Sequence, residues 1–251
     1  MKRPLAASAI ALAIGLAAPA QAFDLTSMTG AERDAFRKEV RDYLMENPEI
    51  IIEAVNTLEA RQAEQAALDD RSMVEVNAKA LFDDGFSWVG GNPDGDVTLV
   101  EFLDYRCGYC RKAHEEVKEL VESDGNIRYI VKEFPILGQD SLTSSRFAIA
   151  TKQIAGDEAY ASVYDTLMNF NGEVTETALR RIGDTLGLEV DPILERMDTD
   201  EVNQVIQQTR ELAQRLQING TPTFVMEDEM LRGYVPLDSM RQVVGAVREN
   251  G

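Results

Sequence analysis

The sequence predicts an α/β protein in which a strand–helix–strand unit is followed by a block of helices and a closing pair of short strands. Three observations support this fold class. Two strand-like apolar runs, at residues 97–104 and 127–134, flank a helix-like run at 111–122. Helical spacing of apolar residues then dominates from 141 to 217. Short apolar runs resume after residue 222, as expected for further strands.

The strand–helix–strand unit has the order and length of a βαβ motif, which joins two parallel strands through a right-handed crossover. In its second strand, Ile127, Tyr129 and Val131 alternate with the residues between them, as in a strand with two distinct faces. The turn sequence Asn92-Pro93-Asp94-Gly95 precedes the unit and separates it from a short candidate strand at 86–89.

The later helices are bounded by local signals. Asp191 before Pro192 is typical of an N-cap with proline at the first helical position. Thr199 is expected to open the next helix, and Asn219-Gly220 to end it with a left-handed cap. Two short strands and a final amphipathic helix are expected beyond this cap, at residues 223–226, 231–235 and 237–247.

Residues 1–22 are expected to be a cleaved export signal. Lys2 and Arg3 precede an apolar run, and Ala20-Gln21-Ala22 fits a small-x-small cleavage site. The alternative is a membrane anchor, but the run is short for a membrane span. Cleavage would place the mature protein in the periplasm, an oxidising compartment in which disulfides persist.

Residues 23–85 are predicted to be helical and separate from the rest. Thr29 with Glu32 indicates a capping box, and Asn47-Pro48 interrupts the helix that follows. The second helix carries only a narrow apolar stripe, so it cannot form a core alone. It either packs on the main domain or associates with copies of itself, as a dimer or a trimer. The stripe consists of Ile51, Val55 and Leu58.

The chain is strongly acidic, with 44 Asp and Glu against 25 Lys and Arg and a formal net charge of −19. Removal of the leader, which contains Lys2 and Arg3, makes the charge still more negative. This balance argues against nucleic acid or an anionic membrane surface as a partner.

The only two cysteines, Cys107 and Cys110, lie between the first predicted strand and its helix. A helix N-terminus favours a thiolate, because free N–H groups and the helix dipole stabilise negative charge. The thiolate is the form that attacks disulfides, so Cys107 is the predicted nucleophile and Cys110 the resolving thiol. The alternatives are an inert structural disulfide or half of a metal site, although two Cys and one His cannot complete a four-ligand zinc site.

Charged residues also occur within the predicted strands. Glu101 lies in the most apolar one, and a buried carboxylate needs a partner or a raised pKa. Lys132, on the neighbouring strand, is the expected counter-charge. The alternative is that both side chains face solvent at an edge.

His114 follows Cys110 by one helical turn, on the same face as both cysteines. It is a candidate for tuning the thiolate by positive charge. The alternative is a partly exposed helical histidine without a role.

Four short motifs carry a resemblance to a known family: Glu101-Phe102, Cys107-Gly108-Tyr109-Cys110, Lys132-Glu133-Phe134-Pro135 and Thr221-Pro222-Thr223-Phe224. Through them, residues 86–251 resemble the DsbA family of exported thioredoxin-like disulfide oxidoreductases. Upstream, the stretch from Tyr43 to Glu49 is similar to the leader of the suppressor-of-copper-sensitivity C proteins. Some of those proteins oligomerise through this leader and act as disulfide isomerases.

The resemblance implies a thioredoxin-like fold with an inserted helical domain and an N-terminal helical extension. Residues 86–140 and 218–251 would form the two parts of the thioredoxin-like domain, and residues 141–217 the helical insertion. The extension at 23–85 would serve oligomerisation.

The resemblance also implies roles for individual residues. Pro222 would follow a cis peptide bond, and the backbone of Thr221 would bind an extended substrate by strand-like pairing. Glu101 would help to move protons at the resolving thiol. Gly108-Tyr109 would contact the substrate; strong oxidases of the family typically have Pro-His there, and Gly-Tyr is similar to the bacterial isomerases.

These observations predict a periplasmic protein thiol–disulfide oxidoreductase with disulfide isomerase character. Its redox group would be the Cys107–Cys110 pair, with no other cofactor. Its partners would be cysteine-containing proteins and a membrane redox protein. The alternatives are a DsbA-like dithiol oxidase and a copper(I)-binding thiol protein, since soft thiolates suit Cu(I).

Overall fold

The computed structural model describes residues 26–250, so the predicted export signal lies outside the described residues. The chain divides into two compact units, with the boundary between Glu59 and Ala60. None of the described helices combines the length and apolar character needed to cross a bilayer.

The N-terminal unit begins with α1 (Gly30–Glu46), and its first turn confirms the predicted capping box. The Thr29 hydroxyl accepts from Glu32 N–H at 3.3 Å, and Thr29 N–H donates to the Glu32 carboxylate at 2.8 Å. Such caps stabilise a helix by about 1 kcal/mol. Helix α2 (Glu49–Phe82) starts directly after Pro48, which confirms the predicted break.

The apolar side chains of the N-terminal unit are exposed. Helix α1 buries none of its residues, and the buried residues of α2 all lie beyond the boundary at residue 60. The helices of this unit therefore form no core of their own among the described residues. Its exposed apolar side chains include Phe36, Val40, Tyr43, Ile51, Val55 and Leu58.

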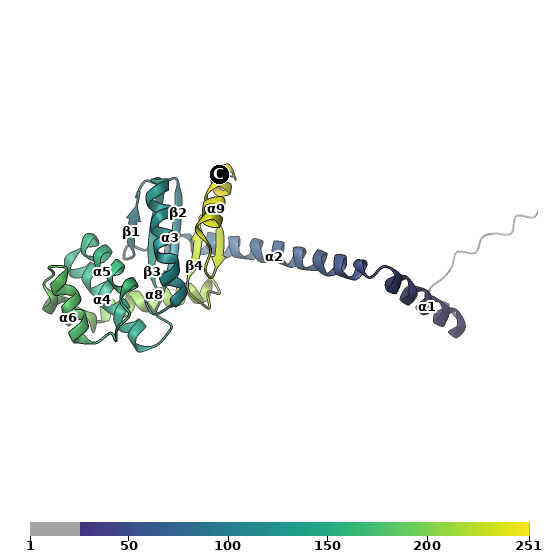
Figure 1. Ribbon diagram of the computed structural model, residues 1–251, viewed down its shortest axis with the longest axis horizontal. Helices are drawn as coiled ribbons and strands as arrows, with labels where there is room; N and C mark the ends of the chain where they lie inside the picture. Colours follow the sequence, from purple (N-terminus) through teal and green to yellow (C-terminus); the bar gives the residue numbers. More distant parts are fainter. Residues whose placement is uncertain (1–25, 251) are drawn as a thin grey trace, which may run out of the picture. The chain divides into compact units, whose positions relative to one another are not determined.

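The second unit contains a five-stranded sheet of order β1-β3-β2-β4-β5 (Figure 1). Strands β2 and β3 are parallel and the other pairs are antiparallel, as a βαβ unit extended by edge strands requires. The strand bounds are Trp88–Gly91 for β1, Val97–Leu103 for β2, Ile127–Glu133 for β3, Thr223–Met226 for β4 and Glu229–Arg232 for β5.

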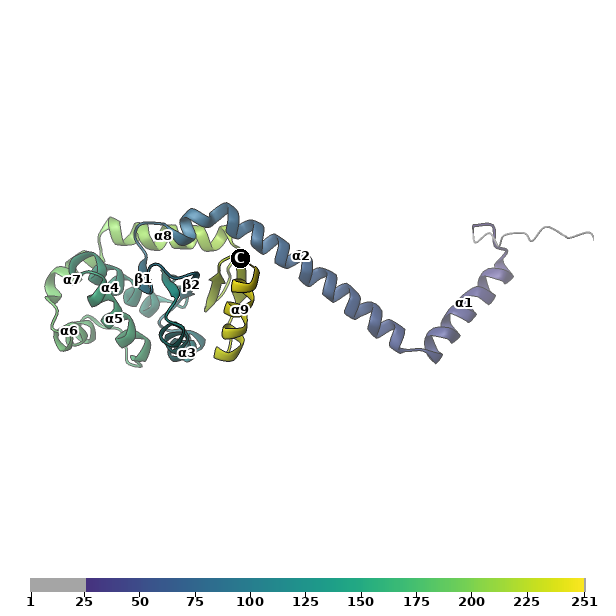
Figure 2. The same ribbon diagram turned by 90° about the horizontal axis from the view of Figure 1, so that it is seen from above.

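Helices cover both faces of the sheet (Figure 2). One face carries α3 (Gly108–Asp124), the crossover helix, and α9 (Leu237–Asn250). The opposite face packs against α8 (Asp200–Arg215) and the C-terminal end of α2, through apolar contacts that include Val74 and Leu81. Alternation along β2 separates the faces, because Leu99 and Leu103 join one core cluster and Val100 and Phe102 the other.

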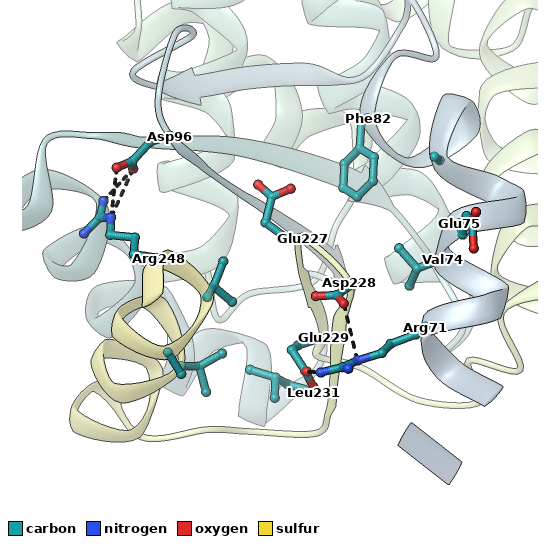
Figure 3. A pocket seen from close by; sticks show the side chains of 14 residues that line it. Arg71, Val74, Glu75, Phe82, Asp96, Glu227, Asp228, Glu229, Leu231 and Arg248 are labelled. Atoms are coloured by element: carbon teal, nitrogen blue, oxygen red, sulfur yellow. Dashed lines mark hydrogen bonds and ion pairs between the residues drawn. The ribbon is translucent and has the colours of Figure 1, made fainter. Parts of the chain in front are cut away.

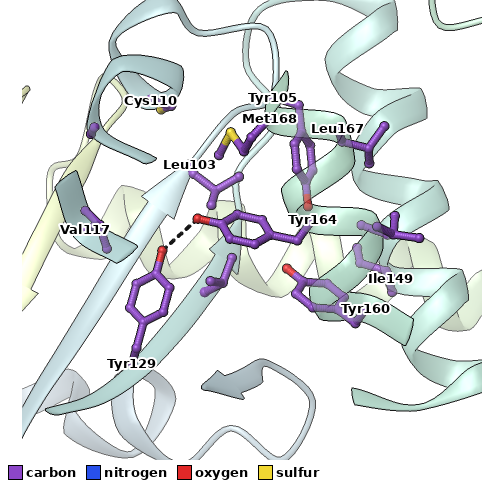
Figure 4. Packing of buried hydrophobic residues seen from close by; sticks show 14 of the residues in the cluster. Leu103, Tyr105, Cys110, Val117, Tyr129, Ile149, Tyr160, Tyr164, Leu167 and Met168 are labelled. Carbon is purple, nitrogen blue, oxygen red and sulfur yellow. Dashed lines mark hydrogen bonds between the residues drawn. The ribbon is translucent and has the colours of Figure 1, made fainter. Parts of the chain in front are cut away.

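The helical block packs against the α3 face of the sheet. Buried tyrosines from the sheet and from α5 gather there around Leu103 and Met168 (Figure 4). Tyr160 and Tyr164 stack with ring centroids 6.2 Å apart, and Trp88 lies 5.5 Å from Tyr160. The block consists of α4 (Gln139–Ala155), α5 (Asp157–Asn169), α6 (Glu176–Thr185) and α7 (Val190–Met197).

Two of the predicted helix ends are wrong. Helix α7 is capped at Glu189, so Asp191 and Pro192 lie within its first turn, where the missing proline N–H has no helical partner to lose. Helix α8 does begin after Thr199, but it ends at Arg215. Gln217, with φ 53°, is the left-handed residue that follows the helix, and Gly220 is not in the left-handed conformation.

The edge strands also differ from their predicted bounds. Strand β1 begins two residues later than expected. Strand β5 covers 229–232 in place of 231–235, because Glu227, with φ 51°, makes a tight hairpin turn directly after β4.

Candidate active site

Both cysteines lie at the start of α3, on the side of the sheet that α3 and α9 cover. Cys107 is the N-cap residue, with extended backbone, and Cys110 lies in the first turn. Cys107 is 7% exposed and Cys110 is fully buried, and both are free thiols in this structure. The first sulfur is therefore the one that a substrate can reach.

The two thiols have opposite acidities. A hydrogen bond from the Cys110 thiol is the largest factor that lowers the pKa of Cys107, to about 5. Contacts with Thr221 and the backbone N–H groups of Cys110 and Tyr109 lower it further, while burial opposes them. Burial raises the pKa of Cys110, and the hydrogen bond with Cys107 and the charge of Glu101 add to that increase. At neutral pH Cys107 is therefore a thiolate and Cys110 a thiol.

A proline loop faces Cys107 from the start of β4. The Thr221-Pro222 peptide bond is cis, as expected. When Cys107 is protonated, its Sγ–H donates to the Thr221 carbonyl oxygen at 3.1 Å. The loop therefore presents backbone groups directly beside the nucleophile.

The dipeptide between the cysteines differs in character from the buried thiols around it. Gly108 borders open space, and Tyr109 is 63% exposed. The Tyr109 ring stacks on Tyr234 with centroids 6.2 Å apart. The predicted substrate-contacting side chain is thus held in place and accessible.

Asp104, which the sequence did not single out, connects two loops near the cysteines. It is fully buried, and its carboxylate accepts from Arg106 N–H at 2.8 Å, in the loop before Cys107. The other carboxylate oxygen accepts from the N–H groups of Ile136 and Leu137 at 2.8 and 3.0 Å. The position of an acid directly after a strand, before a tight loop, was the signal available in the sequence.

The predicted ion pair between Glu101 and Lys132 is wrong. In the register of β2 and β3, Glu101 pairs with Val131 and Phe102 with Lys132, so the two charged side chains point to opposite faces of the sheet. Lys132 instead contacts Asp84 at 2.6 Å, and its Nζ donates to the Ala80 carbonyl at 2.8 Å. Both charged residues are buried, so the solvent-facing alternative is also wrong.

Glu101 has a tyrosine as its partner. The Tyr129 hydroxyl donates to one carboxylate oxygen, and the other oxygen has no hydrogen-bond partner among the described residues. Burial raises the pKa of Glu101 to about 7; the Tyr129 hydrogen bond lowers it and the charge of Cys107 raises it. Glu101 can therefore take up or release a proton near neutral pH, on the same face of the sheet as the cysteines.

The prediction that His114 is partly exposed is also wrong. Its side chain is 4% exposed, and both ring nitrogens contact α5. Nδ1 lies 3.2 Å from the Tyr164 hydroxyl and Nε2 lies 3.0 Å from the Asp165 carboxylate. Neither nitrogen makes a hydrogen bond to Cys107 or Cys110.

One hollow of the second unit is lined by neither cysteine (Figure 3). It measures about 1490 Å³ and is lined by the C-terminal part of α2, the β4–β5 hairpin and α9. Ion pairs occupy its rim, between Arg71 and Asp228 at 3.3 Å and between Arg248 and Asp96 at 2.7 Å. None of the predicted site residues lines it.

Two family models match the chain. A thioredoxin model covers residues 83–246, and a model described as the copper resistance protein ScsC N-terminal domain covers residues 32–65. The first match spans more than half of the chain and includes both cysteines.

Solved structures of similar proteins support the same grouping. A thioredoxin-like oxidoreductase from Silicibacter pomeroyi DSS-3 is 40% identical, with 68% of this chain and 97% of that chain covered and a TM-score of 0.64. The thiol-disulfide exchange protein alpha-DsbA2 from Wolbachia pipientis is 26% identical, covering 73% and 98%, with a TM-score of 0.68. ScsC from Proteus mirabilis in a transitional conformation is 26% identical, covering 88% and 97%, with a TM-score of 0.64.

Curated relatives include larger proteins. The Na(+)/H(+) antiporter NhaA 1 from Salinispora arenicola is 27% identical over 157 residues, which are 62% of this chain and 24% of the antiporter. The chain thus spans about a quarter of the length of that relative. Disulfide bond formation protein D from Bacillus subtilis is 19% identical, covering 61% of this chain and 73% of that protein. With its thioredoxin match and its ScsC-type N-terminal region, the chain belongs to the thioredoxin-like family, among the DsbA-like and ScsC-like oxidoreductases.

Proposed function

We propose that the chain is a periplasmic protein thiol–disulfide oxidoreductase with disulfide isomerase character. The observation that carries the proposal is the acidity of Cys107: its pKa of about 5 makes it a thiolate at neutral pH, beside the cis-proline loop. A thiolate is the attacking species in disulfide exchange. The similarity to proteins named for thiol-disulfide exchange supports the same activity.

The exchange proceeds in two steps. The Cys107 thiolate attacks one sulfur of a substrate disulfide, forms a mixed disulfide and displaces a substrate thiolate. Cys110 then loses its proton and attacks the Cys107 sulfur, which releases the second substrate thiolate. The substrate disulfide is reduced by two electrons, and the Cys107–Cys110 pair is oxidised to the disulfide that serves as its only redox group.

The substrate contacts follow from the groups around the sulfur. The Thr221 backbone beside Cys107 supports pairing with an extended substrate segment, and the exposed Tyr109 ring supports an apolar contact. Both contacts suit a protein chain. They are independent of its sequence, as an enzyme that acts on many proteins requires.

Isomerase character rests on the Gly108-Tyr109 dipeptide and on self-association of the N-terminal unit. The exposed apolar residues of α1 and α2 support an oligomer that presents several sites. Because Val74 and Leu81 of α2 belong to the core of the second unit, a test by deletion of residues 23–85 would damage that unit. Substitutions in the full chain, such as Ile51→Asp with Val55→Asp, are the sharper test.

Refolding of scrambled ribonuclease A by the reduced protein tests the isomerase assignment. The wild type is expected to restore ribonuclease activity, Cys107→Ser to abolish the effect, and Ile51→Asp/Val55→Asp to weaken it together with a lower mass by light scattering. Thr57→Asp, an exposed polar position on the same helix, is the charge control. Oxidation of reduced ribonuclease without rescue of the scrambled form would favour the dithiol oxidase.

Periplasmic location and a membrane redox partner complete the proposal. Cleavage of the leader before Phe23 and recovery of the protein in the periplasmic fraction are the expected results. An uncleaved N-terminus would contradict the location. Trapping of a mixed disulfide on Cys110→Ser in membranes would identify the redox partner.

Copper(I) binding is a second candidate, because the two thiols lie together, with Cys107 the one that can be reached, and the N-terminal family model is described by copper resistance. Cu(I) would be cargo held by the two sulfurs. Titration of the reduced protein with Cu(I) is expected to show one equivalent bound per chain, and Cys110→Ser to lose it. Equal binding by the variant would overturn this candidate.

A further inference from the structure

A continuous row of polar side chains leads from the buried Glu101 to the protein surface. The Tyr129 hydroxyl donates to Glu101 and lies 3.0 Å from the Tyr164 hydroxyl (Figure 4). The Tyr164 hydroxyl lies 3.2 Å from Nδ1 of His114. Nε2 of His114 lies 3.0 Å from the Asp165 carboxylate. The row therefore joins β2, β3, α5 and α3 without a gap.

The row is buried along its length, and the group at its outer end is half exposed. Glu101, Tyr129, Tyr164 and His114 are all buried. The Asp165 side chain is 49% exposed. It borders a surface hollow of about 650 Å³ that is also lined by His114 and Tyr164. A proton that reaches His114 is thus one group away from solvent.

For a fixed number of protons and an ionised Asp165, this row has two states in which every contact is a hydrogen bond, because each tyrosine has one proton to donate. In the first state Glu101 is ionised and accepts from Tyr129. Tyr164 then donates to Tyr129, and a doubly protonated His114 donates to Tyr164. The Nε2–H group of His114 donates to Asp165.

In the second state every hydrogen bond between the ends is reversed. Glu101 is protonated and donates to Tyr129, and Tyr129 donates to Tyr164. Tyr164 donates to Nδ1 of a neutral His114, while Nε2–H still donates to Asp165. The two states hold the same number of protons. Passing from the second state to the first moves one proton from Glu101 to His114. Burial raises the pKa of Glu101 to about 7, so both of its forms are populated near neutral pH.

We propose that Tyr129, Tyr164 and His114 form a proton relay between Glu101 and solvent at Asp165, and that this relay serves the resolving thiol Cys110. The inference rests on the proposed thiol–disulfide exchange. The family resemblance implied a proton role for Glu101. The new element is a pathway from Glu101 to the surface through residues of β3, α5 and α3. Glu101 lies near enough to Cys110 for its charge to raise the pKa of that thiol.

The proton moves as follows during resolution of the mixed disulfide. Cys110 gives its proton to the Glu101 carboxylate, and its thiolate attacks the Cys107 sulfur. The S–S bond between Cys107 and the substrate breaks, and the substrate leaves as a thiolate. With Glu101 protonated and His114 neutral with its proton on Nε2, the row is in the second state. Glu101 then passes its proton to the Tyr129 oxygen, and the Tyr129 and Tyr164 protons each shift one place toward Nδ1 of His114, so Glu101 is ionised again and the row is in the first state. His114 then loses one proton to Asp165 and solvent and returns to its neutral form.

Several charged groups face His114 and set its surroundings. Lys118 of α3 lies 3.7 Å from Asp165, and Glu115 of the same helix lies close to both His114 and Asp165. Tyr164 and Asp165 face it from α5. Acid groups at the outer end and a neutral, buried path at the inner end favour movement of a proton between Glu101 and the surface.

A neighbouring tyrosine provides a matched control. Tyr160 is buried, stacks on Tyr164 and lies in the same helix, but its hydroxyl donates to Glu133 at 2.6 Å and not to Glu101. Tyr160→Phe removes a buried hydroxyl from the same cluster and leaves the relay intact. It separates loss of packing or of a buried hydrogen bond from loss of proton transfer.

The test is a stopped-flow reaction of the reduced full chain with an excess of a chromogenic aromatic disulfide, dithionitrobenzoate. The first coloured thiolate reports attack by Cys107, and the second reports resolution by Cys110. Tyr164→Phe and His114→Ala are expected to leave the first phase unchanged and to slow the second about tenfold or more near neutral pH, since proton transfer by positioned groups commonly contributes factors of about 10²–10⁴. Tyr160→Phe is expected to match the wild type in both phases.

Free imidazole gives a readout that a structural role would not affect. It can enter the hollow left at the mouth in His114→Ala and is expected to restore the second phase there, but not in Tyr164→Phe, where the break lies deeper. A second phase in Tyr164→Phe and His114→Ala as fast as in Tyr160→Phe would overturn the relay and leave the exchange activity standing. A first phase in the wild type no faster than for an ordinary thiol would overturn the proposed function itself.

Discussion

At the scale of single residues, two thiols that lie three positions apart in one helical turn have opposite acidities. Cys107 is at the helix start, where it accepts hydrogen bonds and the helix dipole stabilises its charge. Cys110 is buried, and the loss of solvation keeps its proton on. Because of this difference, Cys107 attacks first, and Cys110 stays protonated until a mixed disulfide has formed.

Tyr129 controls the acidity of Glu101. Its hydrogen bond opposes the burial that raises the pKa of this carboxyl group to about 7. Tyr129→Phe removes that donor, so the pKa of Glu101 is expected to rise above about 7. A carboxyl-carbon NMR titration of Glu101 measures the change. A value that stays the same or falls would show that the tyrosine does not stabilise the ionised carboxylate.

At the scale of elements, a buried ion pair ties the end of α2 to β3. Lys132 contacts Asp84 at 2.6 Å, and the Asp84 carboxylate also accepts from Phe86 and Ser87 N–H groups at 3.0 and 2.9 Å. Burial raises the pKa of Asp84, but the charge and hydrogen bond of Lys132 and the hydrogen bonds from Ser87 together outweigh it, so the net shift is downward. Burial lowers the pKa of Lys132, and the charge and hydrogen bond of Asp84 oppose this shift. The 2.6 Å contact and the Ala80 carbonyl that accepts from Lys132 Nζ favour the charged form of both partners.

Asp84→Asn is expected to lower the free energy of unfolding by about 3 kcal/mol, because it leaves a buried lysine charge without its partner. Chemical denaturation measures this cost. Glu176→Gln, which breaks an exposed i,i+4 pair with Arg180 at 3.0 Å, is the control and is expected to cost less than about 1 kcal/mol. Equal costs for the two variants would contradict the account. The dithionitrobenzoate reaction at Cys107 is expected to be unaffected, since Lys132 lies on the other face of the sheet.

The sequence could predict the elements better than their mutual placement. The alternation of Ile127, Tyr129 and Val131 identified the two faces of β3, and the cysteine motif located the start of α3. The register between β2 and β3 depends on tertiary packing, however, and it decides that Glu101 and Lys132 face opposite sides. Tyr164 could not be connected to Glu101 for the same reason, because α5 lies far from β2 along the chain.

Boundaries failed where tertiary contacts or turn geometry overrode local signals. Gly220 looked like a helix end, yet Gln217 takes the left-handed conformation and the chain then extends into the cis-proline loop. Asp191-Pro192 looked like a helix start, yet α7 begins one residue before Asp191. In both cases the predicted helix is present and only its end differs, by a few residues, which is the usual uncertainty of helix ends.

At the scale of the whole molecule, buried carboxyl groups make stability depend on pH. Burial raises the pKa of Glu133 to about 7, although hydrogen bonds from Tyr160 and Tyr105 oppose the increase. A carboxyl whose pKa is higher in the folded state binds its proton more tightly there. Its stabilising effect is therefore complete at low pH and is lost as the pH rises through about 7.

Glu133→Gln is expected to flatten the fall in unfolding free energy between about pH 4.5 and pH 7, which for one such group amounts to about 3 kcal/mol. Denaturant titrations across this range measure the slope. Glu173→Gln, at an exposed position, is the charge control. A Glu133→Gln variant with the wild-type slope would show that Glu133 does not carry this dependence.

The most direct test of the central claim is the pH dependence of iodoacetamide alkylation at Cys107 in the reduced wild-type protein, followed by mass spectrometry. The pKa of Cys107, about 5, predicts that the rate rises with a midpoint near pH 5 and is constant from about pH 6.5 upward, because the thiolate is then fully formed. A midpoint near pH 8.5, the value of an ordinary cysteine, would contradict the account.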